Sequence, residues 1–142
     1  MNTNLVIDTS VIVKYLNKVN EANIDKADDI IKLGIRGDVS ILVPELVKYE
    51  IGNVLLHGKR LTYKEASISL DAFYSLPLEF IPDSEKLSKK TFDVAYKYGI
   101  TYYDASFLVI AKEYNATLIT ENFKHQGRVK DIQVTALKDY QK

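Results

Sequence analysis

The sequence predicts an α/β domain of three layers, in which a central parallel sheet of about five strands lies between two layers of helices. Short apolar runs alternate with longer amphipathic segments along the chain, which is the pattern of strands joined by crossover helices. The 142 residues fit a single domain spanning 1–142, because typical domains contain about 100 to 150 residues. No internal repeat, low-complexity segment or linker interrupts the alternation.

The first half of the chain predicts two strands and three helices. In order, these are a strand at Leu5–Ile7, a helix after Ser10 through Leu16, a helix at Asn23–Leu33, a strand at Ser40–Val43 and a helix from Pro44 to about Gly58. The stretch from Gly34 to Gly37 is expected to end the second helix. Pro44 is expected to open the third helix, since the first helical position needs no N–H group.

The second half predicts three strands and three further helices. In order, these are a helix after Thr62 through Tyr74, a strand at Leu78–Ile81, a helix from Ser84 to Gly99, a helix from Tyr102 to Tyr114, and strands at Ala116–Thr120 and Ile132–Leu137. Thr62 and Glu65 have the spacing of a capping box, and Ser84 is a favoured N-cap residue. Most of the ten tyrosines lie at core-like helical spacing and are expected to pack inside.

The composition excludes several classes of protein. With 46% hydrophobic residues, 27% charged residues and no cysteine, the chain reads as a globular domain without disulfides or thiolate-bound metals. No apolar run approaches the roughly 18 residues of a membrane span, and the first residues lack a secretory signal, so we expect a cytoplasmic protein without membrane contact. The net charge of +0 leaves nucleic-acid binding to local basic patches.

Four acidic or amide side chains stand where the predicted strands and helices should direct them to one end of the parallel sheet. Asp8 closes the first strand, Asn122 follows the strand that ends at Thr120, Asp104 lies in the first turn of a late helix, and Glu50 lies on the apolar face of the third helix. Ligands of open parallel sheets bind beyond the carboxyl ends of the strands. Because converging carboxylates are costly without a compensating cation, the four positions together predict a metal site.

Each position also has an ordinary structural explanation when it is taken alone. Asp8 and Asn122 suit turns or helix caps, Asp104 suits the positive end of a helix dipole, and Glu50 suits the edge of an apolar stripe, paired with a lysine. The hypothesis of a metal site therefore depends on all four positions taken together.

The composition also indicates which metal would be held. The two histidines, His57 and His125, lack zinc-like spacing, so oxygen ligation of a hard cation is favoured. Three hydroxyl residues beside the four positions are predicted to orient these ligands by hydrogen bonds. They are Thr9, Ser10 and Thr120.

The set of segments around these positions resembles the PIN-domain ribonucleases of the VapC toxin type. The matching segments are Val6-Ile7-Asp8-Thr9-Ser10, Pro44-Glu45-Leu46 leading to Glu50, Tyr103-Asp104-Ala105-Ser106, and Leu118-Ile119-Thr120-Glu121-Asn122. The resemblance implies a PIN-like fold, with Asp8, Glu50 and Asp104 as ligands of Mg²⁺ or Mn²⁺ and Asn122 completing the catalytic site. That family often has Asp at the fourth position, so Asn122 implies weaker binding of a second metal. Glu121 is a possible substitute, although strand alternation is expected to point it elsewhere.

The resemblance also implies an activity and partners. The expected activity is endoribonuclease cleavage of RNA, and the expected partners are a cognate antitoxin and a second copy of the chain, with the helix from Tyr63 to Tyr74 as a candidate contact surface. A group of basic residues follows Asn122 and is either an RNA contact or a solvated loop. The group is Lys124, His125, Arg128 and Lys130, with Lys14, Lys59 and Arg60 as weaker candidates.

Two other functions fit parts of the pattern. A PIN-like module without catalytic activity would bind RNA or protein, and the neutral Asn122 keeps this alternative open. A receiver-type signalling domain also has an acidic magnesium site, but it needs paired acidic residues after its first strand, and Asp8 stands alone there. A phosphatase with an aspartyl nucleophile would need Asp at the position of Ser10.

Overall fold

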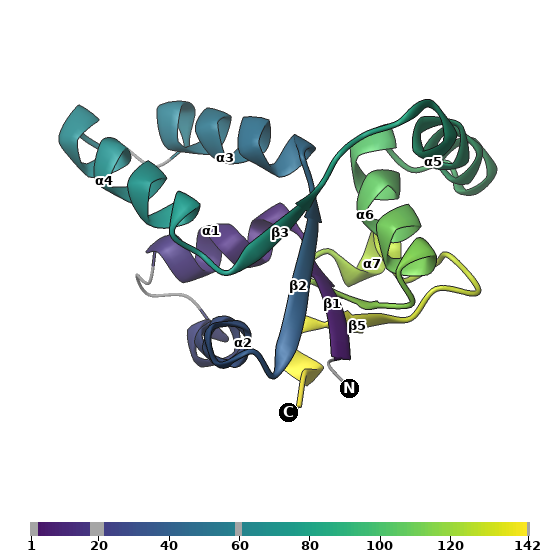
Figure 1. The fold of residues 1–142 in the computed structure, drawn as a ribbon. Helices are drawn as coiled ribbons and strands as arrows, with labels where there is room; N and C mark the ends of the chain where they lie inside the picture. The colour runs from purple at the N-terminus through teal and green to yellow at the C-terminus, as the bar shows by residue number, and fades with distance from the viewer. Residues whose placement is uncertain (1–2, 18–21, 59–60, 142) are drawn as a thin grey trace.

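A five-stranded, wholly parallel sheet forms the centre of the protein, with the strand order β3-β2-β1-β4-β5. The computed structural model, shown in Figure 1, describes residues 3–17, 22–58 and 61–141. The strands are β1 Thr3–Ile7, β2 Val39–Pro44, β3 Leu78–Ile81, β4 Thr117–Thr120 and β5 Val134–Ala136. The predicted fold class and number of strands are therefore confirmed.

Helices cover both faces of this sheet. They are α1 Thr9–Asn17, α2 Ile24–Arg36, α3 Leu46–His57, α4 Tyr63–Tyr74, α5 Glu85–Tyr98, α6 Tyr102–Glu113 and α7 Phe123–Gln126, with a 3-10 turn, η1, at Leu137–Asp139. In Figure 1, α1 to α4 lie on one side of the sheet and α5 to α7 on the other. No helix in the described ranges is long and apolar enough to cross a membrane.

The core is densest where the central strands meet the helices. Val6, Ile7, Leu118 and Ile119, on β1 and β4, are fully buried, and each such side chain contributes about 1.5 to 3 kcal/mol on burial. Leu108 on α6 is also fully buried. This packing fixes the carboxyl ends of β1 and β4, which carry the polar residues considered next.

The chain reverses its direction of travel across the sheet between β1 and β4. It passes from β1 to β2 to β3, and α5 and α6 then return it to β4 on the other side of β1. Such a switch point opens a crevice beyond the strand ends where ligands bind. The receiver-type alternative is wrong, because those domains have the order 2-1-3-4-5.

Pro44 ends a strand, so the prediction that it opens a helix is wrong. It stands opposite Ile81 in the β2–β3 register, and a residue without an N–H group is tolerated at a strand end. The following N–H, of Glu45, donates to the carbonyl of Ile81 at 3.3 Å. Helix α3 then begins at Leu46.

Gly34 lies within α2, and the helix ends inside the stretch from Gly34 to Gly37, as predicted. The helix continues to Arg36 and ends at Gly37, which has a φ of 80°, a left-handed value that suits glycine. A Cβ atom on Gly34 would lie 2.7 Å from Cδ1 of Ile41. The missing side chain therefore allows α2 to approach β2 closely.

The predicted caps are confirmed, and the last boundaries shift. Thr62 and Glu65 form a complete capping box at α4, and the Ser84 hydroxyl accepts the N–H of Leu87 at α5. Strand β5 is shorter than predicted because Leu137 begins the 3-10 turn. Part of the predicted loop after Asn122 forms α7.

Candidate functional site

Asp8 is a buried carboxyl group at the end of β1, where only 7% of the residue is exposed. The Ser10 hydroxyl donates to its Oδ1 at 2.5 Å, and the N–H of Val11 donates to the same oxygen at 3.3 Å. The Thr120 hydroxyl, from the end of β4, donates to Oδ2. The structure thus brings together Asp8 with two of the predicted orienting residues, Ser10 and Thr120.

Thr120 links Asp8 to the turn that follows β4. Its side chain is fully buried, and its oxygen accepts the N–H of Asn122 at 2.7 Å while its hydrogen goes to Asp8. Asn122 therefore joins the site through its backbone. Its side chain makes no capping hydrogen bond to α7.

Glu50 faces the turn between β1 and α1. It is half-buried, at the edge of the stripe formed by the buried residues Val47 and Ile51 of α3. The Thr9 hydroxyl donates to Glu50 Oε1 at 2.6 Å, as expected for the third orienting residue. Because Thr9 follows Asp8 directly, this bond holds α3 next to the Asp8 turn.

Asp104 lies in the first turn of α6 and is partly buried. Its N–H donates to the hydroxyl of the N-cap residue Thr101 at 3.0 Å, and its carbonyl accepts Nε2 of the buried Gln126 at 3.3 Å. Sequence reasoning missed both contacts. The Thr101 cap has a readable signal, a threonine three residues before an acidic one, but no sequence signal identifies Gln126.

The three carboxyl groups are electrostatically coupled. Burial raises the pKa of Asp8, hydrogen bonds from Ser10, Thr120 and Val11 partly oppose this rise, and the negative charge of Asp104 adds to it. Burial also raises the pKa of Glu50, opposed by the Thr9 hydrogen bond and reinforced by the Asp104 charge. The site therefore favours a bound proton or a cation over three free anions.

The donors of this site suit a hard divalent cation by their chemistry. All three are carboxylate oxygens, which Mg²⁺ and Mn²⁺ prefer. Across the ranges that the structure describes, however, no three His, Cys, Asp or Glu side chains already form a metal-ligand cluster. The convergence of Asp8, Glu50 and Asp104 on a single ion therefore stays a prediction.

Glu121 is engaged elsewhere. Its Oε1 lies 3.0 Å from Nζ of the buried Lys14, and the same Nζ donates to the carbonyl of Ala22 at 2.5 Å. This agrees with the expectation that strand alternation turns Glu121 away from Asp8.

The predicted basic group lies on the surface after β4. Lys124 and His125 lie on α7, and Arg128 and Lys130 follow it, all exposed. Arg128 donates to the carbonyl of Tyr98 at 3.4 Å. The weaker candidates Lys59 and Arg60 lie outside the described residues, and RNA contact by this group stays a prediction.

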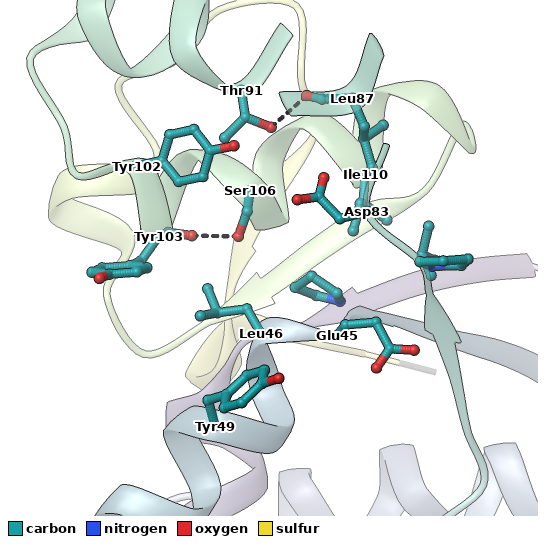
Figure 2. Close-up of a pocket in the computed structure, with 13 residues that line it drawn as sticks. Glu45, Leu46, Tyr49, Asp83, Leu87, Thr91, Tyr102, Tyr103, Ser106 and Ile110 are labelled. Carbon is teal, nitrogen blue, oxygen red and sulfur yellow. Dashed lines mark hydrogen bonds between the residues drawn. The ribbon is translucent and has the colours of Figure 1, made fainter. Parts of the chain in front are cut away.

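A cavity of about 480 Å³ lies between α3, α5 and α6, as Figure 2 shows. Tyr49, Tyr102 and Tyr103 are among the residues that line it. Tyr49 is 77% exposed and Tyr103 is 58% exposed, and seven of the ten tyrosines are exposed in all, so the prediction that most tyrosines pack in the core is wrong. The sequence did not predict this cavity.

Comparison with solved structures finds the same fold over nearly the whole chain. A VapBC2 complex from Rickettsia felis, bound to a DNA fragment from its promoter, matches with a TM-score of 0.74 and 21% identity, covering 94% of this chain and 98% of that one. VapBC-1 from nontypeable Haemophilus influenzae matches with a TM-score of 0.70 and 18% identity, covering 96% and 100%. VapC20 from Mycobacterium tuberculosis, described as a sarcin-ricin loop cleaving toxin, matches with a TM-score of 0.65 and 13% identity, covering 90% and 98%.

Sequence comparison gives a family but no match among the curated proteins. None of the curated proteins matches this sequence significantly. The model of the PIN domain family matches residues 5–131, a range that includes all four candidate positions and runs from within β1 to beyond β4. The chain therefore belongs to the PIN domain family.

Proposed function

We propose that this protein is a metal-dependent endoribonuclease that hydrolyses RNA phosphodiester bonds, and that it is the toxin of a toxin–antitoxin pair. The observation that carries the proposal is the buried Asp8 at the β1–β4 switch point, electrostatically coupled to Asp104 and joined through the adjacent Thr9 to Glu50. Membership of the PIN domain family and the likeness to VapC-containing structures support it.

In this proposal Asp8, Glu50 and Asp104 would hold Mg²⁺ or Mn²⁺. When bound, such an ion supplies an activated water and neutralises charge that develops on the phosphate. Asn122 would complete the site with a neutral oxygen, so a second ion should bind more weakly than it would beside a fourth carboxylate.

The hydroxyl groups of the site set the orientation of its ligands. Ser10 and Thr120 hold the two oxygens of Asp8, and Thr9 holds one oxygen of Glu50. Partners of this kind typically account for 10- to 100-fold in metal affinity or activity. Their fixed geometry favours metal binding, because the carboxylates lose little rotational freedom when an ion arrives.

The likeness to solved structures supports a partner protein for the proposed nuclease. The solved structures from R. felis and H. influenzae are VapBC proteins, which supports a cognate antitoxin for this chain. We also propose a cytoplasmic location and a homodimer. Helix α4 exposes apolar side chains at Tyr63, Ile68 and Tyr74. These offer a surface for such contacts.

A cleavage assay tests this proposal. Purified protein is incubated with structured and single-stranded RNA in Mg²⁺, Mn²⁺ or chelator, beside an Asp8→Asn variant and the control Asp71→Asn, which removes an exposed carboxylate on α4. Cleavage should need the metal, fall at least about 100-fold in Asp8→Asn and persist in Asp71→Asn. Cleavage that continues in chelator or in Asp8→Asn would contradict the proposal.

A second candidate function is a PIN module that binds RNA without cleaving it. It is favoured by the neutral Asn122 and by the lack of a ready-made metal-ligand cluster in the described parts of the chain. RNA binding with no metal-dependent cleavage in the same assay would select this candidate.

A further inference from the structure

We propose that the cavity between α3, α5 and α6 binds a guanine base of the RNA substrate, with the Tyr102 ring against the base and the Asp83 carboxylate accepting its N–H groups. This inference rests on the proposed ribonuclease function. It adds a base-recognition subsite that neither the carboxylate site nor the family match supplies.

The cavity lies on the same edge of the sheet as the carboxylates. Pro44 and Glu45 line it at the end of β2, and Asp83 lines it just after β3, while Asp8 follows β1. Neighbouring strands are about 4.8 Å apart, so the ends of β2 and β3 that line the cavity lie roughly one and two strand spacings from the end of β1. That is the scale on which a base lies from its own phosphate.

The walls of the cavity are suited to the face of a flat ring. Leu46 and Ile110 provide apolar surface, and Figure 2 shows the ring of Tyr102 beside the space between them and α5. Tyr102 is 41% exposed, so its ring is accessible to a ligand. Stacking of a base on an aromatic side chain is worth about 1 to 3 kcal/mol, which corresponds to roughly 5- to 150-fold in affinity.

Two hydroxyl groups that line the cavity, of Ser106 and Thr91, can only accept a hydrogen bond from a ligand. Ser106 donates its hydroxyl hydrogen to the carbonyl of Tyr103 at 2.6 Å, and Thr91 donates its own to Leu87 at 2.8 Å. Both hydroxyl oxygens therefore present only lone pairs to a ligand.

Asp83 adds a charged acceptor. Its Oδ1 already accepts the N–H of Ser84 and the hydroxyl of Ser88, both at 2.9 Å. Figure 2 shows the carboxylate turned into the cavity on the side of Ser106. Oδ2 is therefore the atom that a ligand would meet.

These acceptors favour guanine over the other bases. No lysine or arginine from the described chain lines the cavity, so it disfavours a phosphate and favours a group rich in N–H donors. Guanine has adjacent donors, N1–H and the N2 amino group, which would reach Asp83 and the oxygen of Ser106. In adenine and cytosine the amino group adjoins a ring acceptor that a carboxylate repels, and uracil has a single N–H between two carbonyls.

A titration by NMR with 15N-labelled protein in chelator tests the subsite without metal or catalysis. The probes are the nucleosides guanosine, inosine and uridine. Guanosine should bind, inosine should bind at least about fivefold more weakly because it lacks the amino group, and uridine should bind more weakly still. Shifts should be largest for the amides around Asp83 and Tyr102.

Matched variants assign the roles of the two residues. Asp83→Asn keeps an oxygen for Ser84 but replaces Oδ2 with an amino group, so guanosine affinity should fall about tenfold or more. Tyr102→Ala should lower the affinity for all three nucleosides, while Tyr102→Phe should leave it unchanged. Tyr96→Ala is the control, because Tyr96 is 83% exposed on α5 and does not line the cavity.

Several outcomes overturn the subsite. Equal affinity for guanosine and inosine would do so, as would equal losses from Tyr96→Ala and Tyr102→Ala. Binding of arginine amide in place of guanosine would reassign the cavity to a partner protein. A change of oligomeric state in Tyr102→Ala or Asp83→Asn, with base selectivity unchanged, would reassign it to contacts between copies of the chain.

Different experimental results would contradict the base-recognition subsite and the nuclease function. If the protein cleaves RNA but does not prefer guanosine, the subsite proposal is contradicted and the nuclease proposal stands. If wild-type protein and Asp8→Asn both prefer guanosine but show no metal-dependent cleavage, the cavity is supported as a base site. The nuclease proposal is then contradicted.

Discussion

At the scale of single residues, Asp8 combines a nearly buried carboxyl group with three hydrogen-bond donors and a neighbouring negative charge. Its folded-state pKa lies above the unfolded value, so folding favours the protonated form. The stability that this gives is complete below the unfolded pKa, near 3.8, and is lost as the pH rises through the folded pKa. Without metal, burial of the charged Asp8 should therefore lower the folding stability of the protein at neutral pH.

Replacing Asp8 with an uncharged isostere should relieve that cost. In chelator at pH 7 to 8, Asp8→Asn should raise the melting temperature by a few degrees, and the loss of stability between acidic and neutral pH should become shallower. Thermal unfolding of both proteins from pH 4 to pH 8 measures this. A variant less stable than wild type across that range would show that the hydrogen bonds of Asp8 outweigh its burial.

Thr120 offers a second test at this scale. Thr120→Val keeps the shape of the side chain but removes the hydroxyl shared by Asp8 and the N–H of Asn122. Leaving these buried groups without a partner should lower the free energy of unfolding by about 1 to 3 kcal/mol, as measured in urea. Thr120→Ser retains the hydroxyl and is the control, so an equal loss in both variants would point to packing instead.

The site was most predictable near the ends of β1 and β4. Ser10 follows β1 closely and Thr120 ends β4, so both were expected near Asp8, and both contact it. Gln126 was missed because its contact depends on α7, which has four residues and is too short to show an apolar period.

At the scale of elements, Gly34 sets how closely α2 approaches β2. Gly34→Ala would place a methyl group 2.7 Å from Ile41 Cδ1 and 3.0 Å from Cγ of Pro77, and such overpacking costs about 1 to 3 kcal/mol. The matched control is Gly52→Ala on α3, where a Cβ atom meets nothing within 4 Å and alanine should stabilise the helix by roughly 0.5 to 1 kcal/mol. Urea unfolding should therefore shift in opposite directions, and a shift in the same direction would refute this account of α2 packing.

The sequence predicted well the features that depend on contacts within one element, and poorly those that depend on contacts between elements. The capping box at Thr62 and Glu65 acts within one turn of helix, so local sequence specifies it. The role of Gly34 depends on Ile41 across an interface, and the role of Pro44 depends on its pairing with Ile81 on β3. Those contacts are not visible in local sequence.

At the scale of the whole molecule, a divalent ion bound at the proposed site should stabilise the fold, because the unfolded chain separates the carboxylates that would hold the ion. An ion at 100 times its Kd adds about 2.7 kcal/mol. Mg²⁺ or Mn²⁺ should thus raise the melting temperature of wild-type protein by several degrees, beyond a control of equal ionic strength in NaCl. Asp104→Asn should abolish most of this rise, and an undiminished rise in that variant would exclude Asp104 as a ligand.

The balanced charge of the molecule limits its long-range attraction to RNA. The net charge is +0, so binding should depend on few phosphate contacts. If Lys124, Arg128 and Lys130 each contact one phosphate, the logarithm of the affinity for single-stranded RNA should fall against the logarithm of salt concentration with a slope of about −2. Lys124→Ala should reduce that slope by about 0.7, measured by fluorescence anisotropy in chelator, and an unchanged slope would exclude Lys124 from the contact.

Strand order was the part of the fold that the sequence did not determine. Alternating strands and helices predicted a parallel sheet, but not that β4 lies beside β1. The hydrogen bond from Thr120 to Asp8 spans 112 positions, and burial of Ile7 and Ile119 between the two helix layers holds that pairing.

This late pairing has a consequence for synthesis on the ribosome. Asp8 is translated long before the polypeptide around residue 120, which must emerge before β4 can dock against β1. The first three strands can associate earlier, since they are neighbours in the sheet and in translation order. A chain that has not yet been translated beyond β4 therefore has unfinished surroundings for Asp8, and any activity there is postponed until this part of the chain is made.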